Sequence, residues 1–317
     1  MGIYQSAHLG ENVTLVCRDD RCAVYRLEDE TGEGVMTCYP VLPGVDILYN
    51  DFHINQCASG FHSETALLCI DHCREGRLEW EMGNGTFLYM EAGDIEISTR
   101  SHHDRMFRFP LSHYHGVTVA IRPDETEAAL RLALDGYPLD FTALRRKFCQ
   151  DAAPFIMRAG ASIDHIFSEL YAVPEAIRAS FFRIKVLELL LFLSVTPVPE
   201  HGGERAYFHK AQVEKVKAIM SLMTAHPEKR YTLEALSRSF DFPLTSLKAC
   251  FKGVYGDSIY AYMKSYRMNL AAVRLRKTRE SVTAIALAMG YDNASKFSAA
   301  FRAVMGLTPA EYRRSAV

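Results

Sequence analysis

The chain has 317 residues, of which 49% are hydrophobic, and its formal net charge at pH 7 is −2. This length and composition allow two domains that each bury a core, which excludes a single small binding module. No run of eighteen apolar residues occurs, and the N-terminus lacks a basic segment followed by an apolar one. We therefore expect no membrane span, no signal peptide and a cytoplasmic location.

Charged residues are distributed unevenly along the chain. Residues 205–317 carry 19 basic and 8 acidic side chains, a net charge of +11, whereas residues 1–204 carry 17 basic and 30 acidic ones, a net charge of −13. A basic C-terminal part favours a polyanionic partner, although a basic surface can also be merely solvated.

The first part of the chain has the pattern of a small β domain. Short β-rich runs, such as residues 65–70 and 116–121, are separated by turn signals around Gly85 and Gly93. Many short strands at this spacing favour a barrel or a sandwich. From about Asp124 onwards the apolar residues recur at helical spacing, which predicts a helical segment.

Residues 175–193 form the last predicted helix of this segment and are apolar on several faces. Such a helix needs a partner surface, either only its own β domain or, in addition, a second subunit, and the sequence leaves both open. The proline- and glycine-rich stretch that follows is typical of a linker. The predicted domains are a barrel at residues 1–122, a helical dimerisation segment at 123–193, a linker at 194–207 and a DNA-binding domain at 208–317.

The C-terminal part contains an internal repeat. Leu236 recurs as Ile285, an offset of 49 residues, whereas Phe251 and Gly256 recur as Phe301 and Gly306, an offset of 50. The second copy therefore has one extra residue in its turn. Each copy is predicted to form a helix, a short turn, a second helix and a glycine stop, which is a helix-turn-helix unit.

The second helix of each copy has an exposed side of small, polar or basic residues. Short side chains let a helix approach the DNA major groove, hydroxyls can bond base edges and cations can contact phosphates. One such face could be a solvated surface, but two copies in a basic domain favour double-stranded DNA as the partner. The residues predicted to contact DNA are Thr245, Ser246, Lys248, Ala249, Lys252, Ser295, Lys296, Ser298, Ala299 and Arg302.

A helix is predicted between the two units, at residues 258–277. Twenty helical residues span about 30 Å, close to the roughly 34 Å of one DNA turn. One chain could then place both reading helices in successive major grooves. Four cations near the end of this helix are candidate phosphate contacts, which position a protein without specifying sequence. They are Arg274, Arg276, Lys277 and Arg279.

Residues 210–317 resemble the AraC/XylS family of transcription regulators. The resemblance rests on Leu247-Lys-Ala-Cys-Phe-Lys252, on Arg267-Met-Asn-Leu-Ala271 and above all on residues 282–302 followed by Gly306-Leu-Thr-Pro309. Ala249 departs from the family, whose members often carry a longer polar or basic residue there.

This resemblance implies an α+β chain: an N-terminal cupin-like β-barrel with a helical dimerisation segment, then an all-α domain of two helix-turn-helix units joined by a linker helix. It also implies a sequence-specific regulator, more often an activator, that is controlled by a small-molecule effector in the barrel. The implied partners are DNA, the effector, a second copy in a homodimer and, for an activator, RNA polymerase.

The N-terminal part offers candidate effector contacts. Residues 69–81 resemble the barrel of such regulators, and alternation on a strand places two histidines on one face, which suits a ligand pocket or a metal. The predicted effector contacts are Arg74, Trp80, His113 and His115. Further possible metal ligands are Cys69, His72, Cys73, His102 and His103.

No metal site, cofactor or catalytic residue is predicted, because the metal-cupin pattern of a glycine, a histidine pair and a glutamate is missing around His113. The alternatives are a cupin-type metalloenzyme fused to a DNA-binding tail, a metal- or thiol-responsive regulator that uses Cys69 or Cys73, and an architectural DNA binder without a ligand.

Overall fold

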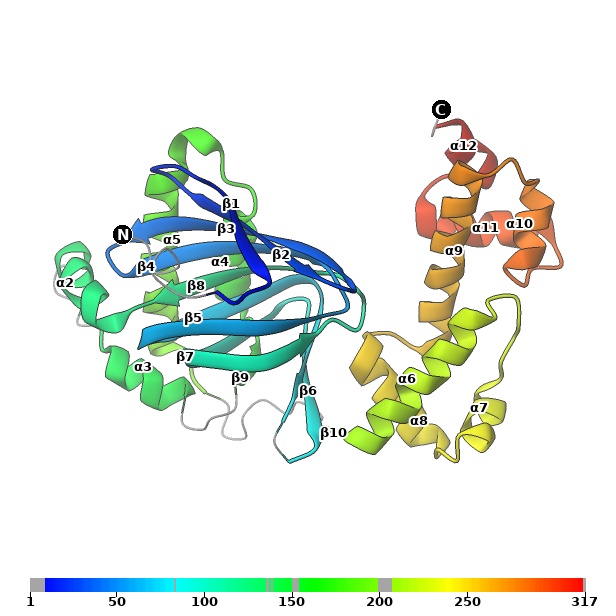
Figure 1. Cartoon of the computed structure of the whole chain (residues 1–317), viewed down its shortest axis with the longest axis horizontal. Coiled ribbons are helices and arrows are strands. Elements are labelled where there is room, and N and C mark those ends of the chain that lie inside the picture. Colours follow the sequence, from blue (N-terminus) through cyan, green and yellow to red (C-terminus); the bar gives the residue numbers. More distant parts are fainter. Residues whose placement is uncertain are drawn as a thin grey trace. The chain divides into compact units, whose positions relative to one another are not determined.

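The computed structural model describes residues 9–82, 84–134, 137, 139–149, 154–198 and 207–315, without the side chains of residues 102–105. The chain divides into two compact units, Met1–Tyr207 and Phe208–Val317. The first unit is a mostly antiparallel sheet with helices and the second is helical (Figure 1). Within the described residues, every helix is too short or too polar to cross a membrane.

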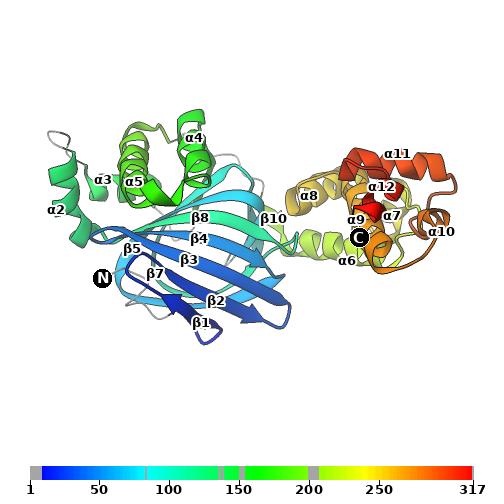
Figure 2. The same cartoon turned by 90° about the horizontal axis from the view of Figure 1, so that it is seen from above.

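The sheet of the first unit is built around one long strand. Its strands follow the order β1-β2-β3-β4-β8-β5-β6, and β7 pairs with both β5 and β9. β5 is 26 residues long and borders β8, β7 and β6 in turn, and the sheet curves around an interior (Figure 2). The strands are β1 (Val13–Arg18), β2 (Ala23–Asp29), β3 (Gly32–Leu42), β4 (Val45–His53), β5 (Gln56–Glu81), β6 (Thr86–Glu91), β7 (Asp94–Arg108), β8 (Tyr114–Ile121) and β9 (Phe155–Arg158).

Helices cover part of the outer face of this sheet (Figure 2). Alternate strand residues point outwards, so Ile47, Ile70 and Val119 pack in one core with Phe167 and Leu189 from the helices. The helices are α2 (Pro123–Ala133), α3 (Phe141–Phe148), α4 (Ala161–Leu170), the short 3₁₀ helix η1 (Glu175–Ile177) and α5 (Arg178–Val195). Helices begin at Pro123, close to the predicted change at about Asp124, but strand β9 lies within the segment that was predicted to be helical.

α5 has one buried and one exposed apolar side. Val186 and Leu189 are fully buried against the sheet, whereas Ile184 and Val195 are 59% and 68% exposed and Phe192 is 37% exposed. The inner side of α5 therefore packs on its own β domain, as one of the two predictions for this helix required. Pairing of the outer side with a second subunit stays a prediction.

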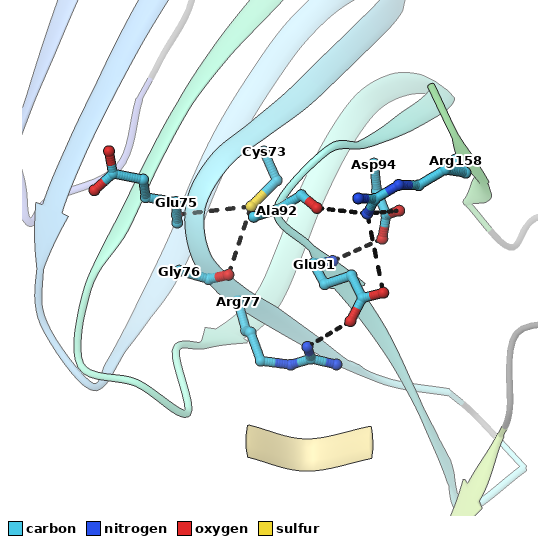
Figure 3. Close-up of polar contacts among 8 residues, drawn as sticks. All are labelled: Cys73, Glu75, Gly76, Arg77, Glu91, Ala92, Asp94 and Arg158. Carbon is cyan, nitrogen blue, oxygen red and sulfur yellow. Dashed lines mark hydrogen bonds and ion pairs between the residues drawn. The ribbon is translucent and has the colours of Figure 1, made fainter. Parts of the chain in front are cut away.

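An ionic network holds β9 to the hairpin of β6 and β7 (Figure 3). Arg158 Nη1 donates to the Ala92 carbonyl at 2.5 Å and lies 3.4 Å from Asp94 Oδ1, while the Glu91 amide donates to Asp94 Oδ2 at 2.8 Å. Glu91 in turn accepts a hydrogen bond of 2.8 Å from Arg77 on β5. Asp94 is fully buried, and Arg158 and the Glu91 amide each compensate part of its charge.

The second unit consists of two helical modules at opposite ends of α9 (Figure 1). The first module contains α7 and α8, with α6 packed on α8, and the second contains α10, α11 and α12. The elements are β10 (Phe208–His209), α6 (Lys210–Ala225), α7 (Leu233–Ser239), α8 (Leu244–Tyr255), α9 (Ile259–Lys277), α10 (Val282–Ala288), α11 (Ala294–Met305) and α12 (Pro309–Arg314).

Candidate nucleic-acid interface

The structure confirms the repeat predicted from the sequence. α10 begins and ends 49 residues after α7, and α11 begins and ends 50 residues after α8. The connection between the two helices is residues 240–243 in the first module and 289–293 in the second, so the extra residue lies in the turn. The joining helix α9 also matches its prediction, with Ser258 as its N-cap.

Local signals in the sequence define both ends of the second helices. Asn293 caps α11, because its side chain accepts hydrogen bonds from the amides of Ser295 and Lys296. Gly256 and Gly306 end α8 and α11 with φ of 85° and 78°, a left-handed conformation that glycine adopts without strain. Asn293 is therefore the N-cap of α11.

α8 and α11 each present the predicted face outwards. The side chains of Leu247, Phe251, Phe297 and Phe301 are fully buried and fix each helix on its module. Ser246 and Ser298 are half-buried at the margin of the two faces. The other predicted contact residues are all exposed, namely Thr245, Lys248, Ala249, Lys252, Ser295, Lys296, Ala299 and Arg302.

The charge on these faces is available to a ligand. Across the described part of the chain, Lys248, Lys252 and Lys296 form no ion pair with an acidic side chain. An exposed cation without a carboxylate partner keeps its attraction for phosphate, since no internal pair has to be broken first. Contact of these residues with DNA stays a prediction.

The cations expected at the end of α9 do not behave alike. Arg274 Nε donates to Glu280 Oε1 at 3.0 Å, and a second bond joins the same two groups. Arg276 lies over the ring of Tyr312, 4.6 Å from its centroid. Both side chains therefore stabilise the module itself. Arg274 reaches Glu280 because the chain turns back after the end of α9. Lys277 and Arg279 are exposed and keep the predicted role of phosphate contacts.

The turn between the two helices of each module contains one residue with a positive φ, which is an aspartate in the first module and a glycine in the second. Asp241 in the first module and Gly290 in the second are equivalent at the offset of 49, and their φ values are 43° and 78°. A Cβ on Gly290 would lie only 2.5 Å from the Glu228 carbonyl oxygen. Arg230 reinforces this contact, since its Nη2 donates to the Gly290 carbonyl at 3.1 Å. Gly290 thus holds the second module to the segment before α7.

The first unit contains a cavity of about 140 Å³ inside the curved sheet. Its walls are mainly apolar and aromatic, and Trp80 is among them. Arg74, His113 and His115 are not among the residues that line this cavity, so their predicted contact with an effector stays a prediction that this cavity does not support. Tyr114 points into it, so by strand alternation His115, the next residue of β8, points to the outer side. Arg74 also lies outside, with its guanidinium 4.6 Å from the Tyr171 ring centroid.

The polar end of this cavity was not foreseen from the sequence. It is formed by Asn50, Asp71, Arg100 and Thr118. Thr118 Oγ1 donates to Asp71 Oδ1 at 2.5 Å and accepts from Asn50 Nδ2 at 2.9 Å, and Arg100 forms an ion pair with Asp71. The one available signal was Asp71 itself, a lone acidic residue within the apolar run of residues 67–73.

Burial and charge set the protonation of this network. Burial raises the pKa of Glu96, which also pairs with Arg100, to about 8. Although burial opposes it, Arg100 holds the pKa of Asp71 below its usual value. Glu96 thus holds its proton more strongly than an exposed carboxyl group, whereas Asp71 favours its carboxylate form beside the Arg100 cation, so that the charges of the network nearly cancel.

The possible ligands Cys69, His72 and Cys73 do not converge. Both cysteines lie in the interior cores of the sheet, whereas His72 points outwards and stacks on Phe167 with ring centroids 4.5 Å apart. Burial raises the pKa of both thiols to about 12, which disfavours the reactive thiolate. The side chains of His102 and His103 lie outside the described residues.

Comparison with known proteins relates the second unit to a family of regulators. A family described as a helix-turn-helix domain matches residues 236–315. The HTH-type transcriptional activator RhaR of Mannheimia succiniciproducens is 28% identical over 40% of this chain and 44% of its own length. A putative AraC-like transcription regulator of Streptomyces lividans is 29% identical over 31% of this chain and 33% of its own length.

A solved structure of a transcriptional regulator with an AraC-type DNA-binding domain, from Chromobacterium violaceum, is 27% identical and covers 33% of this chain and 93% of that one, at a TM-score of 0.31. The chain aligns with less than half the length of the two curated relatives.

Proposed function

We propose, on the basis of the helix-turn-helix domain that matches residues 236–315, that the chain is a sequence-specific transcription regulator of the AraC type whose α8 and α11 read DNA. The observation that carries this proposal is the pair of matching exposed faces on two modules of the same construction. α9 has 19 residues and a length of about 28 Å, which suits two major grooves about one DNA turn apart.

The four cations on these faces give a direct test. Replacement of Lys248, Lys252, Lys296 and Arg302 by Glu reverses the charge that faces the DNA in this proposal. Each lost phosphate contact removes about 0.9 from the slope of log K against log salt, so four contacts would remove up to about 3.6. Binding to fragments of the chain's own genomic neighbourhood, measured by fluorescence anisotropy at several salt concentrations, should be abolished or reduced to a shallow salt dependence.

A matched control replaces four cations on other surfaces of the same unit. Lys210, Lys217, Lys229 and Arg238 lie outside α8 and α11, and their replacement by Glu produces the same change in net charge. If both variants lost the same amount of affinity, the interaction would depend on net charge alone, and the assignment of α8 and α11 as reading helices would be wrong.

In the proposed regulator, a small molecule in the cavity of the first unit controls DNA binding. A cavity of about 150 Å³ holds one benzene ring in other proteins, so the 140 Å³ here suits a molecule with a single ring. Because the charges of Asp71, Arg100 and Glu96 nearly cancel, a neutral polar substituent fits this end better than a carboxylate. Trp80 is the chain's only tryptophan and lines the cavity, so its fluorescence reports occupancy.

Three ring compounds test this part of the proposal. Benzyl alcohol and benzamide should change Trp80 fluorescence at concentrations at which benzoate does not. A compound that binds in the cavity and acts as an effector should also change the affinity of the chain for DNA. Binding of benzoate alone would contradict the proposed preference. DNA affinity that no cavity-binding compound alters would favour a regulator without small-molecule control.

Assembly and output complete the proposal. The exposed side of α5, with Ile184, Phe192 and Val195, is the surface through which two copies would associate. Dimerisation would present four reading helices to one promoter. We propose activation through contact with RNA polymerase as the output, because the resemblance to AraC-type regulators favours it. Transcription from a reporter promoter in the presence and absence of the chain tests this.

A further inference from the structure

We propose that Asp51, His53 and His115 bind one divalent transition-metal ion on the outer face of the sheet. His53 Nε2 lies 3.1 Å from Asp51 Oδ1, and His115 Nε2 lies 3.2 Å from the same oxygen. One ligand atom from each residue lies within 4.8 Å of the other two. This arrangement was not predicted from the sequence, which indicated no metal site, and it does not depend on the DNA-binding function.

The sheet itself brings these three side chains together. Asp51 and His53 are two residues apart on β4 and therefore point to the same face. His115 on β8 is directly opposite Asp51 in the antiparallel register of the two strands. Phe52, between the two β4 ligands, points instead into the cavity. The site is thus separated from the cavity by the thickness of the sheet, and the strand pairing fixes its backbone.

Two imidazoles and one carboxylate are a frequent ligand set for zinc and for related divalent ions. With bonds of about 2.0–2.1 Å from the ion to nitrogen or oxygen, neighbouring ligands of a tetrahedral ion lie about 3.3 Å apart. The observed separations of 3.1 and 3.2 Å fit this value closely. Water can occupy the fourth position, because Asp51 and His53 are 56% and 63% exposed.

His113 adds a second feature of metal sites beside these ligands. Its Nδ1 lies 2.9 Å from the Leu111 carbonyl oxygen, and its ring centroid lies 6.3 Å from that of His115. A histidine that donates from Nδ1 to a backbone carbonyl presents the lone pair of Nε2 outwards, which is the usual state of a metal-ligating imidazole. His113 is therefore a neighbouring imidazole whose hydrogen bond sets the ring state typical of a metal ligand, although it is not one of the three grouped ligands.

Two imidazoles that each donate a hydrogen bond to one carboxylate would show the same distances, so metal binding has to be measured directly. The full-length untagged chain is freed of metal with a chelator and titrated with Co²⁺, whose visible absorption reports tetrahedral nitrogen and oxygen ligands. Zn²⁺ is titrated in parallel by calorimetry. We expect one ion per chain for the wild type, and loss of the cobalt absorption in the double variant His53→Ala/His115→Ala at concentrations that saturate the wild type.

The variant His165→Ala is the matched control, since His165 is also exposed and also has a carboxylate partner, Glu169, at 3.6 Å. It should bind the ion as the wild type does. Trp80 fluorescence establishes that each variant is folded. The proposal is overturned if the wild type binds no ion, if the double variant binds as tightly as the wild type, or if a thiolate-to-cobalt charge-transfer band shows that cysteines hold the ion. DNA affinity, measured separately, tests the proposed function whatever the metal result.

Discussion

Substitution of Gly290 by Ala should destabilise the second unit far more than the same change at Gly306. Both glycines have φ of 78°, so both substitutions place a side chain in the left-handed region, at a cost of about 1–2 kcal/mol. A smaller gain of about 0.4–1 kcal/mol, from the reduced freedom of the unfolded chain, opposes it in both cases. A Cβ on Gly306 meets no atom within 4 Å, whereas one on Gly290 lies 2.5 Å from the Glu228 carbonyl oxygen. Relief of that contact adds about 1–3 kcal/mol for Gly290→Ala alone.

We therefore expect a loss of about 1 kcal/mol in the free energy of unfolding for Gly306→Ala and about 2–4 kcal/mol for Gly290→Ala. Urea unfolding of the full chain separates the two units, because the only tryptophan, Trp80, belongs to the first unit. Circular dichroism, to which the helices of the second unit contribute, should show the change, and the Trp80 transition should not move. Equal losses for the two variants would refute the assignment of Gly290 to a close backbone contact.

Three further predictions concern a cap, a titration and an association surface. Asn293→Ala removes the acceptor of two amide hydrogen bonds at the start of α11 and should cost about 1 kcal/mol in unfolding free energy, with Asn293→Ser as the control that keeps a cap. Burial lowers the pKa of His72 to about 4 from 6.5; since the unfolded chain then binds the extra proton, the stability of the first unit should fall as the pH drops from 6.5 to 4, by about 3 kcal/mol in full. This pH-dependent loss of stability should be absent in His72→Gln. If the wild type and His72→Gln differed in unfolding free energy by the same amount at pH 6.5 and at pH 4, the prediction would be contradicted. Ile184→Glu with Val195→Glu should weaken self-association in sedimentation experiments without moving the urea midpoint of the Trp80 transition. Leu132→Glu is the control, since Leu132 is an apolar residue outside α5 that is even more exposed, at 86%.

The parts of the fold that local sequence determines were predicted well. The helix lengths of both modules, the extra turn residue and the stop at Gly306 depend on residues a few positions apart. The buried stripe with Phe297 and Phe301 and the cap at Asn293 also belong to this class. For this reason the outward face of each second helix could be predicted residue by residue.

The parts that depend on strand register could not be predicted in this way. Alternation placed His113 and His115 on one face of a strand, but it cannot tell the inner face from the outer one. The pairing of Asp71 with Arg100, and of Asp51 with His115, joins residues on different strands that are 29 and 64 positions apart. Arg274 was assigned to phosphate because nothing in its charge indicates that Glu280 already neutralises it.

The alternation of β5 gives Asp71 and His72 opposite surroundings one peptide bond apart. Asp71 contacts the polar network inside the sheet, while His72 stacks on Phe167 of α4 outside it. Because the two residues are consecutive, a shift of the β5 backbone at this point would displace both side chains. We therefore expect a change at the interior network to alter the stacking of His72 on the helical layer as well.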